Sequence, residues 1–254
     1  MSRNDSVIKA FKIIEYLAEE TNGAALKSIS KDLNIDSATA YRYLSSLRDL
    51  GYVQQNQKNL NYQLTTKFTW IASLVLDHIQ IRALAHHKLE ELASIANETV
   101  HLCVLDGTEI TYIDKIDSNQ PVKMRSGIGR RGRVHSTGVG KVMLAFLPEK
   151  ERENLLPKLN LSSLTPNTIT DPIKLCLELD RIRQRGYSID DQEDEVGIRC
   201  VGAPIFDHNG YVIAAISITG WTITMTTDRL VDLSATLLKT SLDISAELGY
   251  RVGH

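Results

Sequence analysis

The stretch from residue 26 to residue 62 constrains the fold of this chain more than any other. Apolar side chains recur every three or four positions within residues 26–33 and again within residues 37–47, so each segment predicts an amphipathic helix. Asn34-Ile35-Asp36 forms the turn between them, and Asp36 or Ser37 can cap the second helix. Two short helices joined in this way predict a helix-turn-helix.

A small hairpin is predicted directly after the two helices. Gly51-Tyr52-Val53 ends the second helix and begins a strand, residues 54–61 form a polar turn, and Tyr62-Gln63-Leu64 is the returning strand. A helix-turn-helix followed by such a hairpin is a winged helix. The alternative is a helical hairpin that packs on another part of the chain.

The exposed face predicted for the second helix is suited to DNA. Short polar or small side chains surround Arg42 there, and a guanidinium on such a surface can contact a phosphate or a guanine edge in the major groove. Residues 1–67 hold nine Lys or Arg against seven Asp or Glu, whereas the whole chain has a net charge of −2. The residues predicted to contact DNA are Lys27, Ser37, Ala38, Thr39, Tyr41, Arg42 and Lys58.

The composition is that of an ordinary globular protein, with 43% hydrophobic and 24% charged residues among 254, a length that suggests two domains. No apolar run approaches the roughly 18 residues needed to cross a bilayer, and the first residues lack the apolar core of a signal peptide. We therefore expect a cytoplasmic protein with no membrane partner. The three cysteines are far apart and include no CxxC pair, which argues against a disulfide framework or a zinc finger.

Residues 6–20 predict the first helix, which Thr21-Asn22-Gly23 ends. This helix has two apolar strips. The strip expected to pack against the helix-turn-helix consists of Val7, Ala10, Phe11, Ile14, Leu17 and Ala18. The second consists of Ile8, Ile13 and Tyr16. Because one small domain offers only one core, a helix that is apolar on two faces is expected to contact a second subunit as well.

Helices are predicted to connect the head of the chain to its body. A linker helix is expected near residues 68–76, and a second helix spans residues 79–97, with one face that carries Leu84, Lys88, Leu92 and Ile95 and a neighbouring line of Leu89, Ala93 and Ala96. No Pro or Gly lies between Gly51 and Gly107. The two parts of the chain are therefore expected to be joined by helix and not by flexible chain.

From Thr99 onward the apolar residues alternate with a period of two, which predicts strands. Strands are expected at residues 100–105, 110–116, 121–125, 187–189, 196–205 and 212–219. Helices are expected from the motif at residues 135–141 through residue 147, at residues 173–185 and at about residues 227–248. The hairpins in this order predict an α+β fold with an antiparallel sheet flanked by helices. The predicted domains are a winged helix-turn-helix at residues 1–66, a linker helix at 67–80 and a ligand-binding domain at 81–254.

A glycine-rich, cationic loop leads into the N-terminus of the helix that the motif at residues 135–141 opens. Residues 127–132 formally match GxGxxG, but a dinucleotide site needs that motif directly between a strand and a helix of a parallel unit, and this region is predicted to be antiparallel. Free backbone N–H groups at residues 136–139, with Arg130 and Arg131 nearby, favour a carboxylate. The alternative is that the loop only turns a corner and the arginines face water or the acidic stretch.

The acidic stretch at residues 190–195 does not have the spacing of an EF-hand, and we interpret it as a solvated loop from which Asp190 points inward to accept a hydrogen bond from a ligand hydroxyl. His101 and Cys103 share one face of a strand, a pairing more typical of core packing than of a metal site or a nucleophile. No GxSxG elbow occurs. We therefore predict no catalytic residue, metal or cofactor, with thiol chemistry at His101, Cys103 and Cys200 as the alternative.

Three groups of motifs, in order along the whole chain, resemble the IclR-type transcriptional regulators of bacteria. The first is the run from Ile29 to Tyr52, with Thr39 and Arg42; the second is His135-Ser-Thr-Gly-Val-Gly-Lys141. The third runs from Arg185-Gly186-Tyr187 through Asp190, Cys200-x-x-Ala203-Pro204 and Ile213-Ala-Ala-Ile-Ser217. Relatives often have alanine at the position of Gly138, a difference that can alter the shape of a pocket.

This resemblance implies a winged helix joined by a helical linker to a GAF-like α/β domain that binds a small metabolite, often a carboxylate. It also implies operator binding as a homodimer or a dimer of dimers. The predicted effector site is Met124, Arg130, Gly138, Val139, Asp190, Ile198, Cys200, Ser217 and Thr219. Residues 98–102, 113–118 and 128–131 most resemble regulators of uronate and pectin breakdown, which respond to 2-keto-3-deoxygluconate. We expect a repressor controlled by such a sugar acid.

Overall fold

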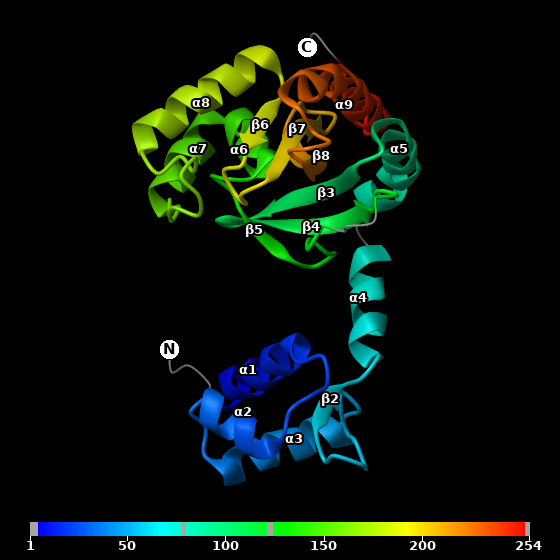
Figure 1. The fold of residues 1–254 in the computed structure, drawn as a ribbon, viewed down its shortest axis with the longest axis vertical. Coiled ribbons are helices and arrows are strands. Elements are labelled where there is room, and N and C mark those ends of the chain that lie inside the picture. The colour runs from blue at the N-terminus through cyan, green and yellow to red at the C-terminus, as the bar shows by residue number, and fades with distance from the viewer. Residues whose placement is uncertain (1–4, 78–79, 121–123, 252–254) are drawn as a thin grey trace. The chain divides into compact units, whose positions relative to one another are not determined.

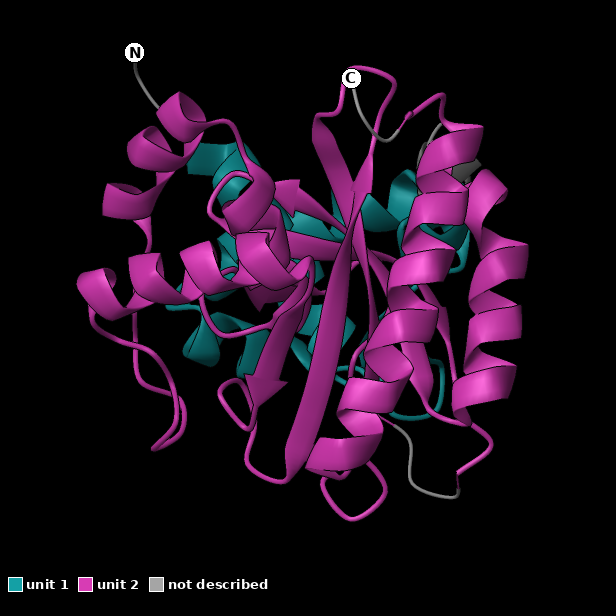
Figure 2. Cartoon of the chain, turned by 90° about the horizontal axis from the view of Figure 1, so that it is seen from above, with its two compact units in different colours: residues 1–78 teal, residues 79–254 magenta. Residues whose placement is uncertain are grey.

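The structure, a computed structural model, describes residues 5–77, 80–120 and 124–251. Its chain separates into two compact units, residues 1–78 and 79–254 (Figure 2). Within the described ranges no helix is both long and apolar enough to span a membrane.

The first unit contains three helices, a hairpin and a fourth helix (Figure 1). These are α1 (Asp5–Glu19), α2 (Leu26–Asp32), α3 (Ser37–Asp49), β1 (Val53–Gln55), β2 (Tyr62–Leu64) and α4 (Lys67–Asp77). The second unit contains α5 (Gln80–Ala96), β3 (Thr99–Asp106), β4 (Glu109–Ile116), β5 (Arg131–Arg133), α6 (Gly138–Phe146), α7 (Glu149–Leu155), the 3₁₀ helix η1 (Leu156–Lys158), α8 (Pro172–Arg185), β6 (Ser188–Asp191), β7 (Ile198–Phe206), β8 (Val212–Trp221) and α9 (Thr227–Glu247).

The predicted helix-turn-helix and wing are confirmed. The Asp36 carboxylate caps α3 because it accepts hydrogen bonds from the backbone N–H groups of Ala38 at 2.9 Å and Thr39 at 3.2 Å. Ile29 of α2 and Leu44 of α3 are fully buried and belong to one core cluster. Strands β1 and β2 pair in antiparallel register to form the wing.

The predicted core stripe of α1 is confirmed only at its C-terminal end. Leu17 is 3% exposed and Ile14 packs against the core cluster, whereas Val7 is 51% exposed and Phe11 is 58% exposed. Ile13, which was assigned to the second strip, is fully buried. Both strips of α1 are apolar and both have helical spacing, so periodicity alone could not decide how the core divides them. The packing of α1 on α3 and β2 buries the C-terminal half of the helix and leaves apolar side chains at its N-terminal end exposed.

The second unit is built around a six-stranded antiparallel sheet in the order β5-β4-β3-β8-β7-β6. Helices α5 and α9 pack against one face, and α6 packs against the other with α8 beside it (Figure 1). Two separate apolar clusters follow this arrangement, one under α5 and α9 and one under α6 and α8. The predicted antiparallel sheet flanked by helices is confirmed.

The line of buried residues on α5 runs through Ile81, Ala85, Leu89 and Leu92, whereas Ile95 is 65% exposed. One strand prediction in this unit needs correction. The predicted strand at residues 121–125 lies partly outside the described residues, and its last two positions are not in a strand. The strand that completes the sheet is β5, which pairs with β4.

Candidate functional site

A cavity of about 400 Å³ opens on the face of the sheet that carries α6. All nine residues predicted to bind an effector lie around it: Met124, Arg130, Gly138, Val139, Asp190, Ile198, Cys200, Ser217 and Thr219. They come from β6, β7, β8, the start of α6 and the segment before β5. The fold thus gathers positions that are up to 95 residues apart in the chain (124 to 219). Their role in ligand binding stays a prediction.

Strand register explains how these side chains meet. Asp190 of β6 is paired with Cys200 of β7, and Cys200 is paired with Thr219 of β8. In the next row on the same face, Ser217 of β8 is paired with His101 of β3. Because alternate residues of a strand point to the same face, these two rows form one continuous polar wall of the cavity.

The N-terminus of α6 forms another wall. Thr137 caps this helix through a hydrogen bond from the backbone N–H of Gly140 to the Thr137 hydroxyl at 3.2 Å. Within the described chain, the backbone N–H groups of Gly138 and Val139 have no acceptor. Both residues line the cavity, so the positive end of the helix is available to an anion.

Gly138 lets the helix start approach β7 closely. A Cβ atom at this position would lie 2.9 Å from the Cys200 Sγ and 3.5 Å from the Ser188 hydroxyl. Contacts below 3.0 Å are essentially never observed for real Cβ atoms, so an alanine here would displace the thiol or the helix. The glycine therefore sets the width of the cavity beside Cys200.

Asp190 is the acidic group deepest in this wall. It is 4% exposed, and its Oδ1 accepts hydrogen bonds from the backbone N–H groups of Glu193 at 2.7 Å and Asp194 at 3.4 Å. Burial raises the pKa of Asp190 to about 7 although Lys141 acts in the opposite direction. A carboxyl group titrating near neutrality can either accept or donate a hydrogen bond to a ligand hydroxyl.

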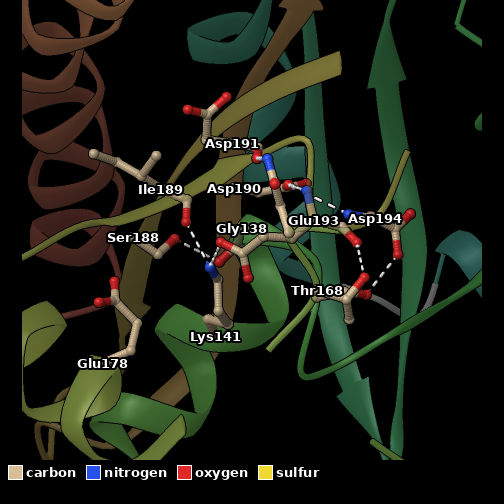
Figure 3. Close-up of polar contacts among 12 residues, drawn as sticks. Gly138, Lys141, Thr168, Glu178, Ser188, Ile189, Asp190, Asp191, Glu193 and Asp194 are labelled. Atoms are coloured by element: carbon tan, nitrogen blue, oxygen red, sulfur yellow. Dashed lines mark hydrogen bonds and ion pairs between the residues drawn. The ribbon is translucent and has the colours of Figure 1, made fainter. Parts of the chain in front are cut away.

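A buried ion pair lies behind Asp190. Lys141 extends from α6, fully buried, toward the backbone carbonyl of Ile189 and the Glu193 carboxylate, both of which accept hydrogen bonds from it (Figure 3). Burial nevertheless raises the pKa of Glu193, since desolvation outweighs the attraction of the ammonium group. Thr168 donates to the backbone carbonyl of Glu193 at 2.6 Å and fixes the loop that follows β6.

The arginines near the cavity have different roles. Arg131 forms ion pairs with Asp106 at 2.6 Å and Glu109 at 2.9 Å, so its charge is partly neutralised. Arg130 donates to the backbone carbonyl of Arg125 at 2.6 Å. Arg125, which the sequence did not indicate, also lines the cavity and has no partner among the described side chains.

Several other lining residues were missed by sequence reasoning, among them Tyr112, Ser126, Asp194 and Glu195. His101 was interpreted as a core residue. It is buried, but it lies on the cavity wall. Strand alternation indicated that His101 points to the same face as Cys103. Only the pairing of His101 with Ser217 shows that this part of the face borders a cavity.

The thiols do not favour the alternative of thiol chemistry. Burial raises the pKa of Cys103 well above its usual value. Burial is also the main cause that raises the pKa of Cys200 to about 12. A nucleophilic cysteine requires the opposite shift. Within the described ranges, no group of three or more His, Cys, Asp or Glu side chains is arranged to hold a metal.

The residues predicted to contact DNA lie in the first unit. Lys27, Ser37, Ala38, Tyr41, Arg42 and Lys58 are exposed, and Thr39 is half-buried. The Arg42 guanidinium lies 5.5 Å from the centre of the Tyr43 ring. This surface is separate from the cavity, which belongs entirely to the second unit.

Family models match both units of the chain. The model described as the IclR helix-turn-helix domain matches residues 6–57, and the model described as the bacterial transcriptional regulator IclR C-terminal domain matches residues 73–246. The chain belongs to the IclR family of bacterial transcriptional regulators. The proteins of this family are regulators of transcription and not enzymes.

Relatives with similar sequences span nearly the whole chain. The regulators named KdgR from Dickeya chrysanthemi and from Escherichia coli (strain K12) are each 36% identical over 245 residues, which is 96% of this chain and 80% and 93% of theirs. The transcriptional repressor IclR of Escherichia coli is 30% identical over 246 residues, 96% of this chain and 90% of that protein.

Solved structures show the same fold. The crystal structure of the Thermotoga maritima IclR has a TM-score of 0.83 and 39% identity and covers 96% of this chain and 99% of that chain. An IclR homolog from Microbacterium hydrocarbonoxydans, solved in complex with 4-hydroxybenzoate, has a TM-score of 0.81 with 20% identity and covers 96% and 98%. At that identity the likeness concerns the fold alone.

Proposed function

We propose that this IclR-family regulator is a repressor that binds operator DNA through α3 and the wing, and that a sugar acid such as 2-keto-3-deoxygluconate in the cavity controls that binding. The observation that carries the effector proposal is the chemistry of the cavity. An anion-binding helix terminus at Gly138 and Val139 forms one wall, and hydroxyl and carboxyl groups form another.

The assignment of α3 as the recognition helix is supported by its exposed face. Ser37, Ala38 and Thr39 are small and lie at its N-terminal end, followed by the long Arg42 side chain. Recognition helices place such N-terminal residues against base edges in the major groove. Lys58 in the exposed turn of the wing supplies a second positive charge for the phosphate backbone.

A carboxylate effector fits the cavity in one orientation. Its carboxylate would accept hydrogen bonds from the free N–H groups of Gly138 and Val139, and Asp190 would face its hydroxyl groups, not its negative charge. The volume of about 400 Å³ lies within the roughly 300–1,000 Å³ typical of small-molecule sites. The similarity to two regulators named KdgR and the complex of a homolog with 4-hydroxybenzoate, also a carboxylate, support this class of ligand.

Homodimers, which can pair into dimers of dimers, are the proposed assembly. The exposed side chains of Val7, Ile8 and Phe11 at the N-terminal end of α1 support it, because large exposed apolar side chains gathered on one helix favour contact with another subunit. Dimeric readers need their recognition helices roughly 34 Å apart, about one turn of DNA. An effector can change this spacing only if it binds the DNA-competent and incompetent arrangements with different affinity.

Gel-shift titration of the full chain on double-stranded fragments from its own promoter region tests the proposal. We expect Arg42→Ala to weaken binding about 10- to 100-fold, the loss of one bidentate base contact. Lys12→Ala, an exposed cation on α1 outside the proposed surface, is the matched control and should bind normally. Unchanged affinity in Arg42→Ala would remove α3 from the DNA contact.

The effector is tested in the same assay. We expect 2-keto-3-deoxygluconate to release wild-type protein from the fragment, and calorimetry on the same preparation should show one ligand per chain. Protein that binds the fragment but neither binds nor responds to the sugar acid would contradict the effector class while leaving the DNA assignment intact.

A further inference from the structure

His101 of β3 lies on the cavity wall but is not among the residues predicted to bind the effector. Its side chain is 2% exposed, and it is paired in register with Ser217 of β8, whose side chain is 1% exposed. Thr219 is two residues farther along β8 and therefore points to the same face. The ring of Tyr112 meets the imidazole edge to face, with the ring centres 5.0 Å apart, and holds its orientation.

Three hydroxyl groups surround the imidazole. The Ser126 hydroxyl lies 2.7 Å from Nε2, and the hydroxyls of Ser217 and Thr219 both lie 3.4 Å from Nδ1. The first distance is that of a strong hydrogen bond, whereas 3.4 Å is at the limit for an O–H···N bond. The hydroxyls of Ser217 and Thr219 thus share the Nδ1 atom of His101 at long distances. A ligand hydroxyl placed between these groups could form shorter hydrogen bonds with them.

The imidazole is neutral in this environment. Burial lowers the pKa of His101 to about 3, and the nearby positive charge of Lys115 acts in the same direction. Lys115 itself is held by Asp117 at 2.9 Å and by the backbone carbonyls of Met124 and Ser126. A neutral imidazole has one N–H donor and one nitrogen acceptor, and each adjacent hydroxyl can both donate and accept.

We propose that His101, with Ser126, Ser217 and Thr219, is a hydroxyl-binding wall that makes the cavity selective for carboxylates with a polyhydroxyl chain. The inference rests on the proposed function, since it presumes that a carboxylate enters this cavity. An alcohol group is donor and acceptor at once and so matches every group of the wall. An alkyl chain leaves the buried His101 and Ser217 and the half-buried Ser126 and Thr219 without the hydrogen bonds that a hydroxylated ligand would make, which lowers its affinity.

A matched pair of ligands separates this role from simple packing. 2-Keto-3-deoxygluconate and 2-oxohexanoate have the same six-carbon chain, carboxylate and keto group, and they differ only in three hydroxyls. Calorimetry on the full wild-type chain is expected to show at least about 10-fold tighter binding of the hydroxylated ligand, the size of effect that buried hydrogen-bonding groups produce. Equal affinities would overturn the inference while keeping the carboxylate site.

Variants then assign the selectivity to this wall. His101→Phe keeps an aromatic ring against Tyr112 but removes both nitrogens, and we expect it to lose about 10- to 100-fold in affinity for 2-keto-3-deoxygluconate with little change for 2-oxohexanoate. His101→Gln, which keeps a donor and an acceptor, should retain most of the selectivity. Thr219→Val, which removes a hydroxyl at constant shape, should lose part of it even if His101→Phe fails to fold.

Each other outcome contradicts the inference. Equal losses for both ligands in His101→Phe and Thr219→Val would show that the wall only shapes the cavity. Unchanged binding of the sugar acid in both variants would show that the ligand does not contact it. Wild-type protein that binds neither ligand would overturn the proposed sugar-acid effector and this inference together, and the gel-shift result for Arg42→Ala would be unaffected.

Discussion

The two faces of the six-stranded sheet are made by the same strands but differ in chemistry. On the face under α5 and α9, Val100, Leu102, Ile216 and Ile218 are fully buried in one apolar cluster. The neighbouring positions on the other face include His101, Ser217 and Thr219, which line the cavity. This second face also carries the apolar cluster under α6 and α8, so it combines hydrophobic stabilisation with polar groups at the cavity.

Along β3 and β8, residues that pack in the apolar cluster under α5 and α9 alternate with residues that line the cavity. A shift of register by a single residue would exchange the two faces, so the apolar cluster under α5 and α9 also fixes which side chains reach the cavity.

The largest effect is expected for the buried ion pair between Lys141 and Glu193. Glu193→Ala removes the partner of the fully buried Lys141 ammonium, and leaving such a charge unpaired costs about 3–5 kcal/mol of unfolding free energy. Urea unfolding should show this loss, and Lys141→Met/Glu193→Ala should recover most of it. A single variant as stable as wild type would show that the ion pair contributes nothing to the polar face.

On the apolar face, Leu102→Ala should lower the unfolding free energy by about 3 kcal/mol, because it opens a cavity in a close-packed cluster. Effector affinity should stay within about 2-fold, since Leu102 points away from the ligand and distant sites act nearly independently. Calorimetry and urea unfolding on one preparation measure both quantities. A large loss of affinity would mean that the two faces are coupled.

Asp190→Asn is expected to stabilise the protein in a pH-dependent way. Burial raises the pKa of Asp190 from 3.8 to about 7, so the folded state binds this proton more tightly than the unfolded state does, and the unfolding free energy falls as the pH rises from about 4 to about 7. The amide should therefore raise the unfolding free energy by about 1–3 kcal/mol at pH 8, and the gain should vanish near pH 4.

The same variant should bind the operator fragment normally but respond weakly to the effector, because Asp190 is proposed to face the ligand hydroxyls. Thermal unfolding between pH 4 and pH 8, followed by gel shifts with and without sugar acid, measures both effects. A stability gain that does not depend on pH would contradict the assigned titration, and a normal response would remove Asp190 from the ligand contact.

The smallest effect on stability is expected for Gly138→Ala. The new Cβ would lie 2.9 Å from the Cys200 Sγ, so we expect a loss of about 1 kcal/mol or less and a several-fold lower effector affinity as the cavity narrows. Cys200→Ala in the same chain should restore affinity by removing the contact. Failure of this rescue would show that the backbone of α6, and not the thiol, responds to the added methyl group.

Much of the fold was predictable because its signals are local. The spacing of apolar residues predicted α2 and α3, Asp36 predicted a cap, and the alternation of apolar residues predicted the strands at 100–105 and 110–116. How the core divides the two strips of α1 was not predictable, since both have the same periodicity. Strand β5 is three residues long and polar at each end, so its sequence carries no strand signal at all.

The candidate site was predictable only in part. Family motifs placed Gly138, Asp190 and Cys200 in the site, and the residues themselves indicated the anion-binding start of α6. His101 gave no such signal, because a histidine beside apolar strand residues is most often a core residue. Its place on the cavity wall follows from pairing with a strand more than 100 residues away (101 to 217).

The sequence by itself determined most of the helices and strands and which family the chain resembles, because spacing, capping and motifs act over a few residues. Tertiary structure alone decided which face of each strand borders the cavity, which apolar residues of α1 are buried and which carboxyl group titrates near neutrality. The physical reason is that burial and desolvation depend on neighbours brought together by the register of distant strands, and no local pattern encodes that register.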